Sequence, residues 1–275
     1  MPDSRAFFNR GPVRAIAHRG GGGMGPENSL VAMERSLAAG ADVLEVDVRC
    51  TRDGVFILHH DPTLIRVAGL SASPEEILSV ELERIDLREN WNPPEGIGSA
   101  SVESPAEPVP LPTLRQAFAA FPEARFSLDV KLPHLSVVRS LYELLHTEGA
   151  AERVLLGSFH GAVVREGRKL SPGIATQATE RELLSLYTRA MLGRRLPSKL
   201  PFQSIAVPEH WRGIPVAARH FIRAMRERGV CFSVWTVNDA QRIRRLLERG
   251  VDALVTDYPA RVVAVCTELQ GADDP

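Results

Sequence analysis

The sequence predicts a (β/α)8 barrel, and three observations carry this prediction. Short apolar runs rich in β-branched residues alternate along the chain with amphipathic stretches of helical spacing. Gly40, Gly149, Gly229 and Gly250 each separate a predicted helix from the strand that follows, which is typical of glycines that end helices. About eight such units fit within the 275 residues. Repeated strand–helix units form a parallel sheet, and eight of them close into a barrel.

Nine strands are predicted, one more than the barrel needs, so one of them is expected to lie outside it. They are residues 13–17, 43–48, 55–59, 126–130, 154–158, 174–177, 204–207, 231–235 and 253–256. The clearest helices are predicted at residues 30–39, 136–148, 217–228 and 240–249.

A loop-rich insertion interrupts the predicted barrel at about residues 64–112, because its second half is rich in Pro, Gly and Ser. Long loops of this kind are usually lids, binding loops or mobile insertions. The remaining elements form one series, so we expect a single domain over residues 1–275.

The overall composition excludes several classes of partner and site. A net charge of −1 creates no field that would attract nucleic acid, so no nucleic-acid partner is expected. The three cysteines lack C-x-x-C spacing, which argues against a disulfide framework or a thiolate metal site. The first residues lack the apolar run of a signal peptide, and no run approaches the roughly 20 apolar residues of a membrane span. We therefore expect a cytoplasmic protein; its oligomeric state is left open.

A glycine-rich segment follows the first predicted strand and reads H-R-G-G-G-G-M-G-P-E-N from His18. Clustered glycines would let the backbone pass close to a small ligand, and His18 with Arg19 suggests that this ligand is an anion such as phosphate. A plain strand-to-helix turn explains the same glycines equally well.

Carboxylates gather at the ends of two predicted strands. Glu45 and Asp47 share one face of their strand because side chains alternate. Asp129 ends a later strand, two residues before Lys131. Such carboxylates repel one another unless a cation lies between them or basic residues such as Arg19 or Lys131 pair with them. Three oxygen ligands suit one divalent cation, Mg²⁺ or Ca²⁺, better than zinc.

The dipeptide Asp53-Gly54 predicts a two-residue hairpin turn after the carboxylate strand. Counting back from that turn places His60 opposite Asp47 and turns His59 to the other face. A different turn would change this register.

These side chains favour one kind of chemistry. His18 and His60, on either side of a divalent-cation site, suit general acid–base catalysis. Arg19 and Lys131 suit the negative charge of a phosphodiester.

The motifs resemble, in order, the signature of glycerophosphodiester phosphodiesterases, the phospholipase-C-like barrel phosphodiesterases. They are H-R-G, P-E-N-S, G-A-D-V-L-E-V-D-V, T-R-D-G and H-H-D, followed by S-F-H, V-W-T-V-N-D and G-V-D-A-L-V-T-D-Y-P. The resemblance covers nearly the whole chain. It implies a barrel with one divalent metal bound by Glu45 and Asp47, the catalytic pair His18 and His60, and a phosphate contact from Arg19. It also implies that Trp235 lines the substrate side.

The reaction implied by this resemblance is metal-dependent hydrolysis of glycerophosphodiesters to glycerol 3-phosphate and an alcohol. Many family members have Glu in an E-x-K strand where this chain has Asp129; an Asp there resembles the lysophospholipase-D branch and venom sphingomyelinases D. That branch would release the head-group alcohol from a lysophospholipid and leave lysophosphatidic acid or its cyclic form. A barrel that has lost catalysis and serves as a binding module is a more remote alternative.

A late segment, residues 183–202, mixes apolar and basic side chains. Its apolar members are Leu183, Leu184, Leu186, Tyr187, Met191, Leu192, Leu196, Leu200 and Phe202. They either pack a barrel helix or form an apolar wall over the site that binds an acyl chain. In the second case the segment would also make peripheral contact with a membrane.

Overall fold

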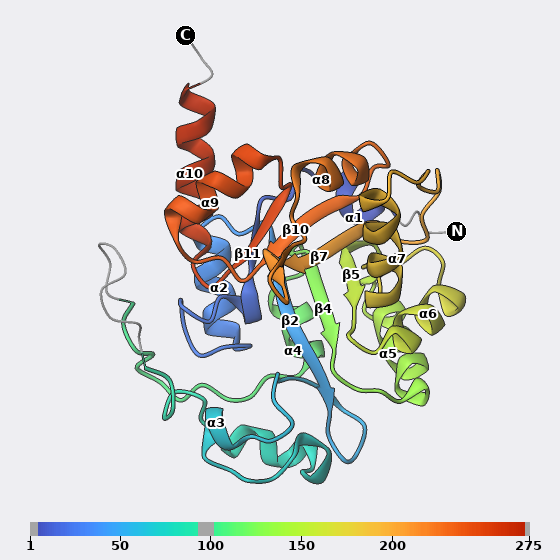
Figure 1. Cartoon of the computed structure of the whole chain (residues 1–275). Coiled ribbons are helices and arrows are strands. Elements are labelled where there is room, and N and C mark those ends of the chain that lie inside the picture. The colour runs from blue at the N-terminus through green and yellow to red at the C-terminus, as the bar shows by residue number, and fades with distance from the viewer. Residues whose placement is uncertain (1–4, 93–101, 273–275) are drawn as a thin grey trace.

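The computed structural model describes residues 5–92 and 102–272, and the described chain forms a parallel barrel surrounded by helices (Figure 1). The sheet runs in the order β6-β5-β4-β2-β1-β11-β10-β7. A parallel bridge between Gln177 and Ser204 joins its two ends and closes the barrel. The strands are β1 (Ala15–Ala17), β2 (Val43–Cys50), β4 (Phe126–Val130), β5 (Val154–Gly157), β6 (Ala175–Thr176), β7 (Ser204–Pro208), β10 (Cys231–Trp235) and β11 (Ala253–Thr256). The predicted barrel is confirmed.

Amphipathic helices cover the outside of this barrel. They are α2 (Leu30–Ala38), α4 (Leu114–Ala120), α5 (Leu135–Thr147), α6 (Gly161–Leu170), α7 (Glu180–Met191), α8 (Arg219–Arg226), α9 (Ala240–Arg249) and α10 (Pro259–Ala272). Several begin where a side-chain oxygen accepts a hydrogen bond from a backbone N–H of the first turn, which stabilises a helix start. These N-caps are Ser29, Thr113, Thr179 and Asp239. Within the described residues, no helix is both long enough and apolar enough to span a lipid bilayer.

Strand alternation gives the barrel interior an apolar end and a charged end. At the amino end, Val43 packs with side chains of neighbouring strands and with Phe7 of the short helix α1 (Ala6–Asn9). Glu45 and Asp47 lie two and four residues further along β2, on the same inner face. The charged side chains therefore lie at the carboxyl end of the strands, where barrel enzymes place their active sites.

The extra strand is β3 (Phe56–Leu58), which pairs antiparallel with β2 outside the barrel. The predicted two-residue turn is wrong, because three residues separate Thr51 from Val55 and the Thr51 N–H donates to the Val55 carbonyl. The register therefore shifts by one residue, and the His59 N–H donates to the Asp47 carbonyl. Strand β3 ends at Leu58, so alternation no longer decides where the side chain of His60 points.

The first described part of the insertion, residues 64–92, lies at the end of the barrel toward which the arrows of β2 and β4 point (Figure 1). It contains α3 (Ile65–Ala68) and the 3₁₀ helices η2 (Pro74–Glu76) and η3 (Ser79–Arg84). Its buried side chains, including Leu64 and Val67, pack against Ile57 of β3 in a small core. The part of the predicted loop at residues 93–101 lies outside the described residues.

The segment at residues 183–202 packs on the barrel rather than covering its carboxyl end. Leu186 and Phe202 are buried, and Leu183, Tyr187, Leu196 and Leu200 pack against the same core, while Leu184, Met191 and Leu192 are exposed. Arg228, which precedes β10 at the amino end, donates to the Pro197 carbonyl 2.9 Å away. Of the two alternatives left open, these contacts support the first, in which the segment packs a barrel helix. Contact of this segment with a membrane stays a prediction.

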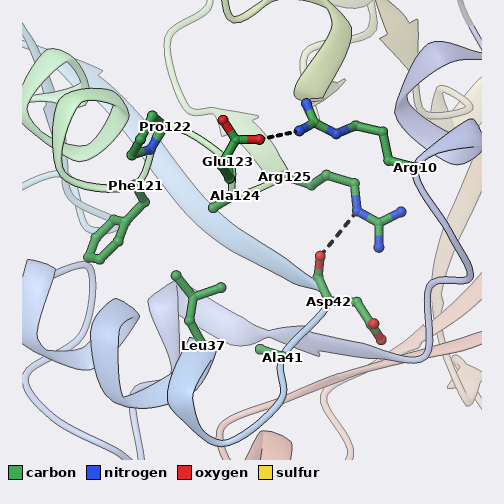
Figure 2. Close-up of a pocket in the computed structure, with 9 residues that line it drawn as sticks. All are labelled: Arg10, Leu37, Ala41, Asp42, Phe121, Pro122, Glu123, Ala124 and Arg125. Carbon is green, nitrogen blue, oxygen red and sulfur yellow. Dashed lines mark hydrogen bonds and ion pairs between the residues drawn. The ribbon is translucent and has the colours of Figure 1, made fainter.

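A hollow of about 550 Å³ opens at the amino end of the strands, lined by the segments that precede β2 and β4 (Figure 2). Its charged side chains already have partners, because Arg10 pairs with Glu123 and Arg125 donates to the Asp42 carbonyl. It lies at the opposite end of the barrel from the carboxylates, so it is not the candidate active site.

Candidate active site

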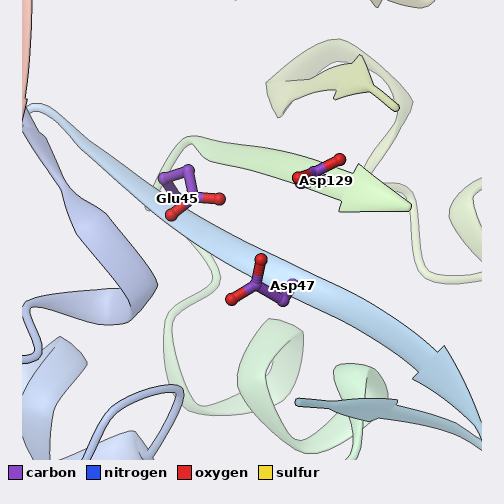
Figure 3. Close-up of side chains that lie close together, drawn as sticks. All are labelled: Glu45, Asp47 and Asp129. Atoms are coloured by element: carbon purple, nitrogen blue, oxygen red, sulfur yellow. The ribbon is translucent and has the colours of Figure 1, made fainter. Parts of the chain in front are cut away.

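Three acidic side chains converge at the carboxyl end of two neighbouring strands (Figure 3). Asp47 of β2 and Asp129 of β4 are register partners, and Glu45 lies two residues earlier on β2. One ligand oxygen from each side chain lies within 4.8 Å of the others. This arrangement follows from two parallel strands that each carry an acidic residue on the inner face near the carboxyl end.

Basic side chains compensate these charges only in part. Lys131 Nζ lies 2.9 Å from Asp47 Oδ1 and 2.6 Å from Asp129 Oδ2, so the pairing with Lys131 that the sequence left open is present. Glu45 accepts one hydrogen bond from the Arg19 backbone N–H, at 2.8 Å. Burial and the neighbouring Asp47 charge nevertheless raise the pKa of Glu45 to about 7. The three carboxylates still repel one another, and a divalent cation bound by their oxygen atoms would balance this negative charge.

Arg19 lies beside this cluster in a conformation with positive φ, 53°. Its Nε is 3.8 Å from Asp47 Oδ2 and has no hydrogen-bond partner among the described residues, although it is buried. Its NH1 donates to Glu27 at 3.0 Å. A buried donor without a partner is costly, and an anionic ligand oxygen would satisfy it.

Two of the glycines after Arg19 are required by packing within the protein. A Cβ at Gly21 would collide with Ser36 Oγ, and one at Gly23 would collide with the Tyr258 ring. Gly20 and Gly21 also have positive φ, 74° and 97°. These contacts support the strand-to-helix turn as a reason for the glycines, and the approach of a ligand to this backbone stays a prediction.

His18 follows β1 and is held by a carboxylate that follows β11. Its Nδ1 donates to Asp257 Oδ1 at 2.8 Å, and the other Asp257 oxygen accepts from Asn238 Nδ2 at 2.6 Å. Burial alone would lower the pKa of His18, but the hydrogen bond to Asp257 and the Glu45 charge outweigh burial and raise it. With Nδ1 bonded to Asp257, Nε2 is the ring atom left for proton transfer.

His60 is held in the same way on the other side of the cluster. Its Nδ1 donates to Asp61 Oδ1 at 2.7 Å. The charge of His60 also helps to lower the pKa of Asp47, which places this ring within electrostatic reach of the carboxylates. His59 instead donates from Nε2 to the Thr63 carbonyl at 2.9 Å, and burial lowers its pKa. The register predicted for the two histidines is wrong, and the choice of His60 as the catalytic one stays a prediction that these contacts support.

An aromatic pair flanks the site at the ends of β10 and β5. Trp235, the last residue of β10, is 37% exposed and meets the Phe159 ring edge-on at a centroid distance of 6.4 Å. Lys131 Nζ lies 5.7 Å from the centroid of the Phe159 ring. Trp235 is thereby connected through Phe159 to the charged cluster.

The structure thus brings all the predicted site residues to one end of the barrel, and it adds residues that the sequence analysis left without a role. Asn28, which was not assigned to the site, forms two hydrogen bonds with Asp47. Asn28 Nδ2 donates to Asp47 Oδ2 at 2.9 Å, and Asn28 Oδ1 accepts from the Asp47 N–H at 3.1 Å. Asp257, Asn238 and Asp61 orient the histidines. All four belong to the quoted motifs P-E-N, T-D-Y-P, V-N-D and H-H-D, which were the available signal.

Known proteins are related to this chain in sequence and in fold. A family model described as the glycerophosphoryl diester phosphodiesterase family matches residues 18–261. The chain is 29% identical to a probable glycerophosphodiester phosphodiesterase 2 of Mycobacterium tuberculosis, over 91% of this chain and 89% of the relative. It is 27% identical to the human lysophospholipase D GDPD3, over 90% of this chain and 83% of the relative.

A solved Oleispira antarctica phosphodiesterase in complex with the product sn-glycerol-3-phosphate has the same fold, with a TM-score of 0.73 and 19% identity over 95% of this chain and 99% of that one. The family match covers the barrel from His18, at the end of β1, to the start of α10. The chain belongs to the glycerophosphoryl diester phosphodiesterase family.

Proposed function

We propose that this enzyme hydrolyses glycerophosphodiesters to glycerol 3-phosphate and an alcohol, with His18 and His60 as its acid–base pair. One observation carries the proposal. Each histidine is bonded through Nδ1 to its own carboxylate, and both rings lie within electrostatic reach of a cluster of three acidic side chains next to Arg19. General acid–base catalysis needs two such groups held in fixed orientations.

Glu45, Asp47 and Asp129 would hold one divalent cation, Mg²⁺ or Ca²⁺. When bound, the cation would offset the negative charge of the nonbridging phosphate oxygens. Arg19 would contribute to the same charge balance, because its buried Nε has no partner among the described residues. Lys131 would provide a second positive charge close to the carboxylates it already contacts.

The two histidines would move protons on opposite sides of the phosphate. We assign His18 to the side of the attacking hydroxyl and His60 to the leaving alcohol. Asp257 and Asp61 fix the tautomer of each ring, so that Nε2 faces the reacting atoms. Asp257 also stabilises the protonated form of His18, as the raised pKa of that ring indicates.

A second candidate function is lysophospholipase D activity at the same site. The exposed Phe159–Trp235 pair beside Lys131 favours it, because these rings offer apolar surface next to the phosphate-binding charges. The human relative named a lysophospholipase D gives further support.

The two candidates are separated by offering glycerophosphocholine and lysophosphatidylcholines of increasing chain length, below their critical micelle concentrations. We expect glycerophosphocholine to be hydrolysed and kcat/KM to be nearly independent of acyl length, because residues 183–202 do not cover the site. Burial of an acyl chain would instead contribute about 0.8 kcal/mol per methylene, so a few methylenes would raise kcat/KM by tens-fold. A steep rise with chain length, reduced in W235A, would favour the lysophospholipase D.

Replacing Asp257 with Asn is expected to change the pH profile as well as the rate. Asp257 raises the pKa of His18, so the loss of Asp257 lowers that pKa. One limb of the kcat/KM profile reports the titration of His18, and this limb should move to lower pH. We expect kcat to fall by about 10- to 100-fold, by analogy with the loss of a carboxylate that orients a histidine in a metal site. If His18 is the base, the acidic limb moves; if the alkaline limb moves, the assigned roles are reversed. An unchanged profile would contradict a role for this pair.

A further inference from the structure

An arginine of the insertion connects the two sides of the site. Arg66 lies on α3 and forms a fork between two carboxylates. Its Nε donates to Asp61 Oδ2 at 2.6 Å, and its NH1 and NH2 donate to the two oxygens of Glu27 at 2.8 and 2.6 Å. One guanidinium group therefore uses three donors on two acidic side chains from different segments of the chain.

Each of those carboxylates holds a residue of the proposed site. The other oxygen of Asp61 accepts from His60 Nδ1 at 2.7 Å. Glu27 accepts from Arg19 NH1, with its two oxygens 3.0 and 3.2 Å away. A continuous chain of hydrogen bonds thus runs from the imidazole of His60 through Asp61, Arg66 and Glu27 to the guanidinium of Arg19.

We propose that Arg66 is a positioning residue that fixes His60 and Arg19 relative to one another, an inference that rests on the function proposed above. It touches neither the substrate nor the reacting atoms and acts through Asp61 and Glu27. Through Asp61 it sets the orientation of the imidazole that protonates the leaving alcohol. Through Glu27 it sets the position of the guanidinium that contacts the phosphate.

The geometry requires an arginine. A planar guanidinium binds one carboxylate in a bidentate manner and still presents Nε to a second, whereas a lysine ammonium is a single point of charge. Burial would raise the pKa values of Glu27 and Asp61, but the hydrogen bonds from Arg66 outweigh burial and lower both. Both carboxylates are thereby kept ionised as acceptors for Arg19 and His60.

The core of the insertion fixes the place of Arg66. Leu64 and Val67, on either side of it in the sequence, are buried in the small core that packs on Ile57 of β3. The Leu64 N–H also donates to the Ala72 carbonyl. The Arg66 side chain is 47% exposed, yet its backbone is anchored by these buried neighbours. The insertion therefore presents Arg66 to the edge of the site, a role separate from that of a lid.

The test separates this role from that of a surface ion pair by measuring two constants in parallel. The kcat for glycerophosphocholine reports the proton transfer by His60, and the dissociation constant of inorganic phosphate in the presence of metal reports Arg19. We expect D61N to lower kcat and leave phosphate affinity nearly unchanged. We expect E27Q to weaken phosphate binding with a smaller effect on kcat. R66M should change both constants, each by about 10-fold, the scale of losing an outer-shell partner.

The coupling is tested by double variants and by a matched control. Because Arg66 acts on His60 through Asp61, the R66M/D61N double variant should have nearly the same kcat as D61N alone. The two fold-losses of kcat should not multiply. R84M, which removes an exposed arginine at the end of η3 in the same insertion, should leave both constants unchanged. Circular dichroism and thermal melts establish the folded fraction to which each constant is normalised.

R66K tests the same idea if R66M fails to fold. Lysine keeps the charge but cannot span both carboxylates as the fork does, so at least one of the two constants should remain several-fold impaired. Wild-type values of both constants in R66K, or in folded R66M, would overturn the proposal, and so would independent, multiplicative losses in R66M/D61N. Failure of the proposed function is a different result: the wild-type enzyme would then show no hydrolysis of glycerophosphocholine with any divalent cation.

Discussion

Replacing Glu45 with Gln is expected to lower kcat/KM by about 10³-fold or more while leaving the metal-free protein folded. The variant loses one of the three carboxylates that would hold the cation. Metal ions stabilise the charge of a transition state by several kcal/mol, and each 1.36 kcal/mol corresponds to a factor of ten in rate. The measurement is kcat/KM over a titration with Mg²⁺ and with Ca²⁺, in which E45Q should also need more cation to reach its lower plateau.

The same variant should have the opposite effect on the stability of the metal-free protein. The folded chain keeps a proton on Glu45 up to about pH 7, whereas the ordinary value is 4.5. The free energy of unfolding therefore falls as the pH rises between these two values, because Glu45 loses its proton at a lower pH in the unfolded chain than in the folded one. E45Q removes this contribution, so its thermal midpoint in EDTA should equal or exceed that of the wild type at pH 8.

E123Q is the control for both measurements, because Glu123 lies at the amino end of the barrel and pairs with Arg10. It should keep the wild-type dependence on metal. If E45Q retained wild-type turnover and metal affinity, the carboxylate cluster would not be the metal site.

H18A and H60A are each expected to lower kcat by about 10²- to 10⁴-fold, the range for losing a general acid or base. Both rings have Nδ1 bonded to a carboxylate and Nε2 left to transfer a proton. H59A is the matched control from the adjacent position. Its ring bonds the Thr63 carbonyl and is buried, so its loss should lower the thermal midpoint but change kcat per folded molecule much less.

The comparison is made at the pH optimum, with the folded fraction measured for each variant. A large loss of kcat per folded molecule in H59A, together with a nearly unaffected H60A, would reverse the assignment of the two histidines. Equal and small losses in H18A and H60A would contradict acid–base catalysis by this pair.

Patterns local to the sequence predicted the barrel and the acidic side chains that lie together at its carboxyl end. Strand alternation correctly placed Glu45 and Asp47 on one face, and the acidic end of the next strand of the sheet brought Asp129 beside them. The register of β3 could not be read in the same way. Thr51 Oγ1 bonds both Asp53 and the Val55 N–H, and these side-chain contacts stabilise a turn longer by one residue than the dipeptide Asp53-Gly54 suggests.

Other features depend on contacts between distant segments, which composition alone does not reveal. The glycines at positions 21 and 23 are small because Ser36 and Tyr258 occupy the space beside them, and no local pattern predicts those neighbours. Six of the nine apolar residues of segment 183–202 pack against the barrel core, and two of these six are buried. Their position relative to the site depended on the direction of α7, which runs from the carboxyl end of β6 toward the amino end of β7.

The carboxylate cluster and the two histidines together would form a metal-dependent phosphodiesterase site. Phosphorus NMR of glycerophosphocholine with metal-depleted enzyme is the direct test of this site. With the wild-type enzyme, the signal of the diester should persist in EDTA and should convert to that of glycerol 3-phosphate when Mg²⁺ or Ca²⁺ is added in excess. With the H18A/H60A variant, the signal of the diester should persist even in the presence of excess metal. Conversion at the full rate in EDTA, or by the double variant, would contradict it.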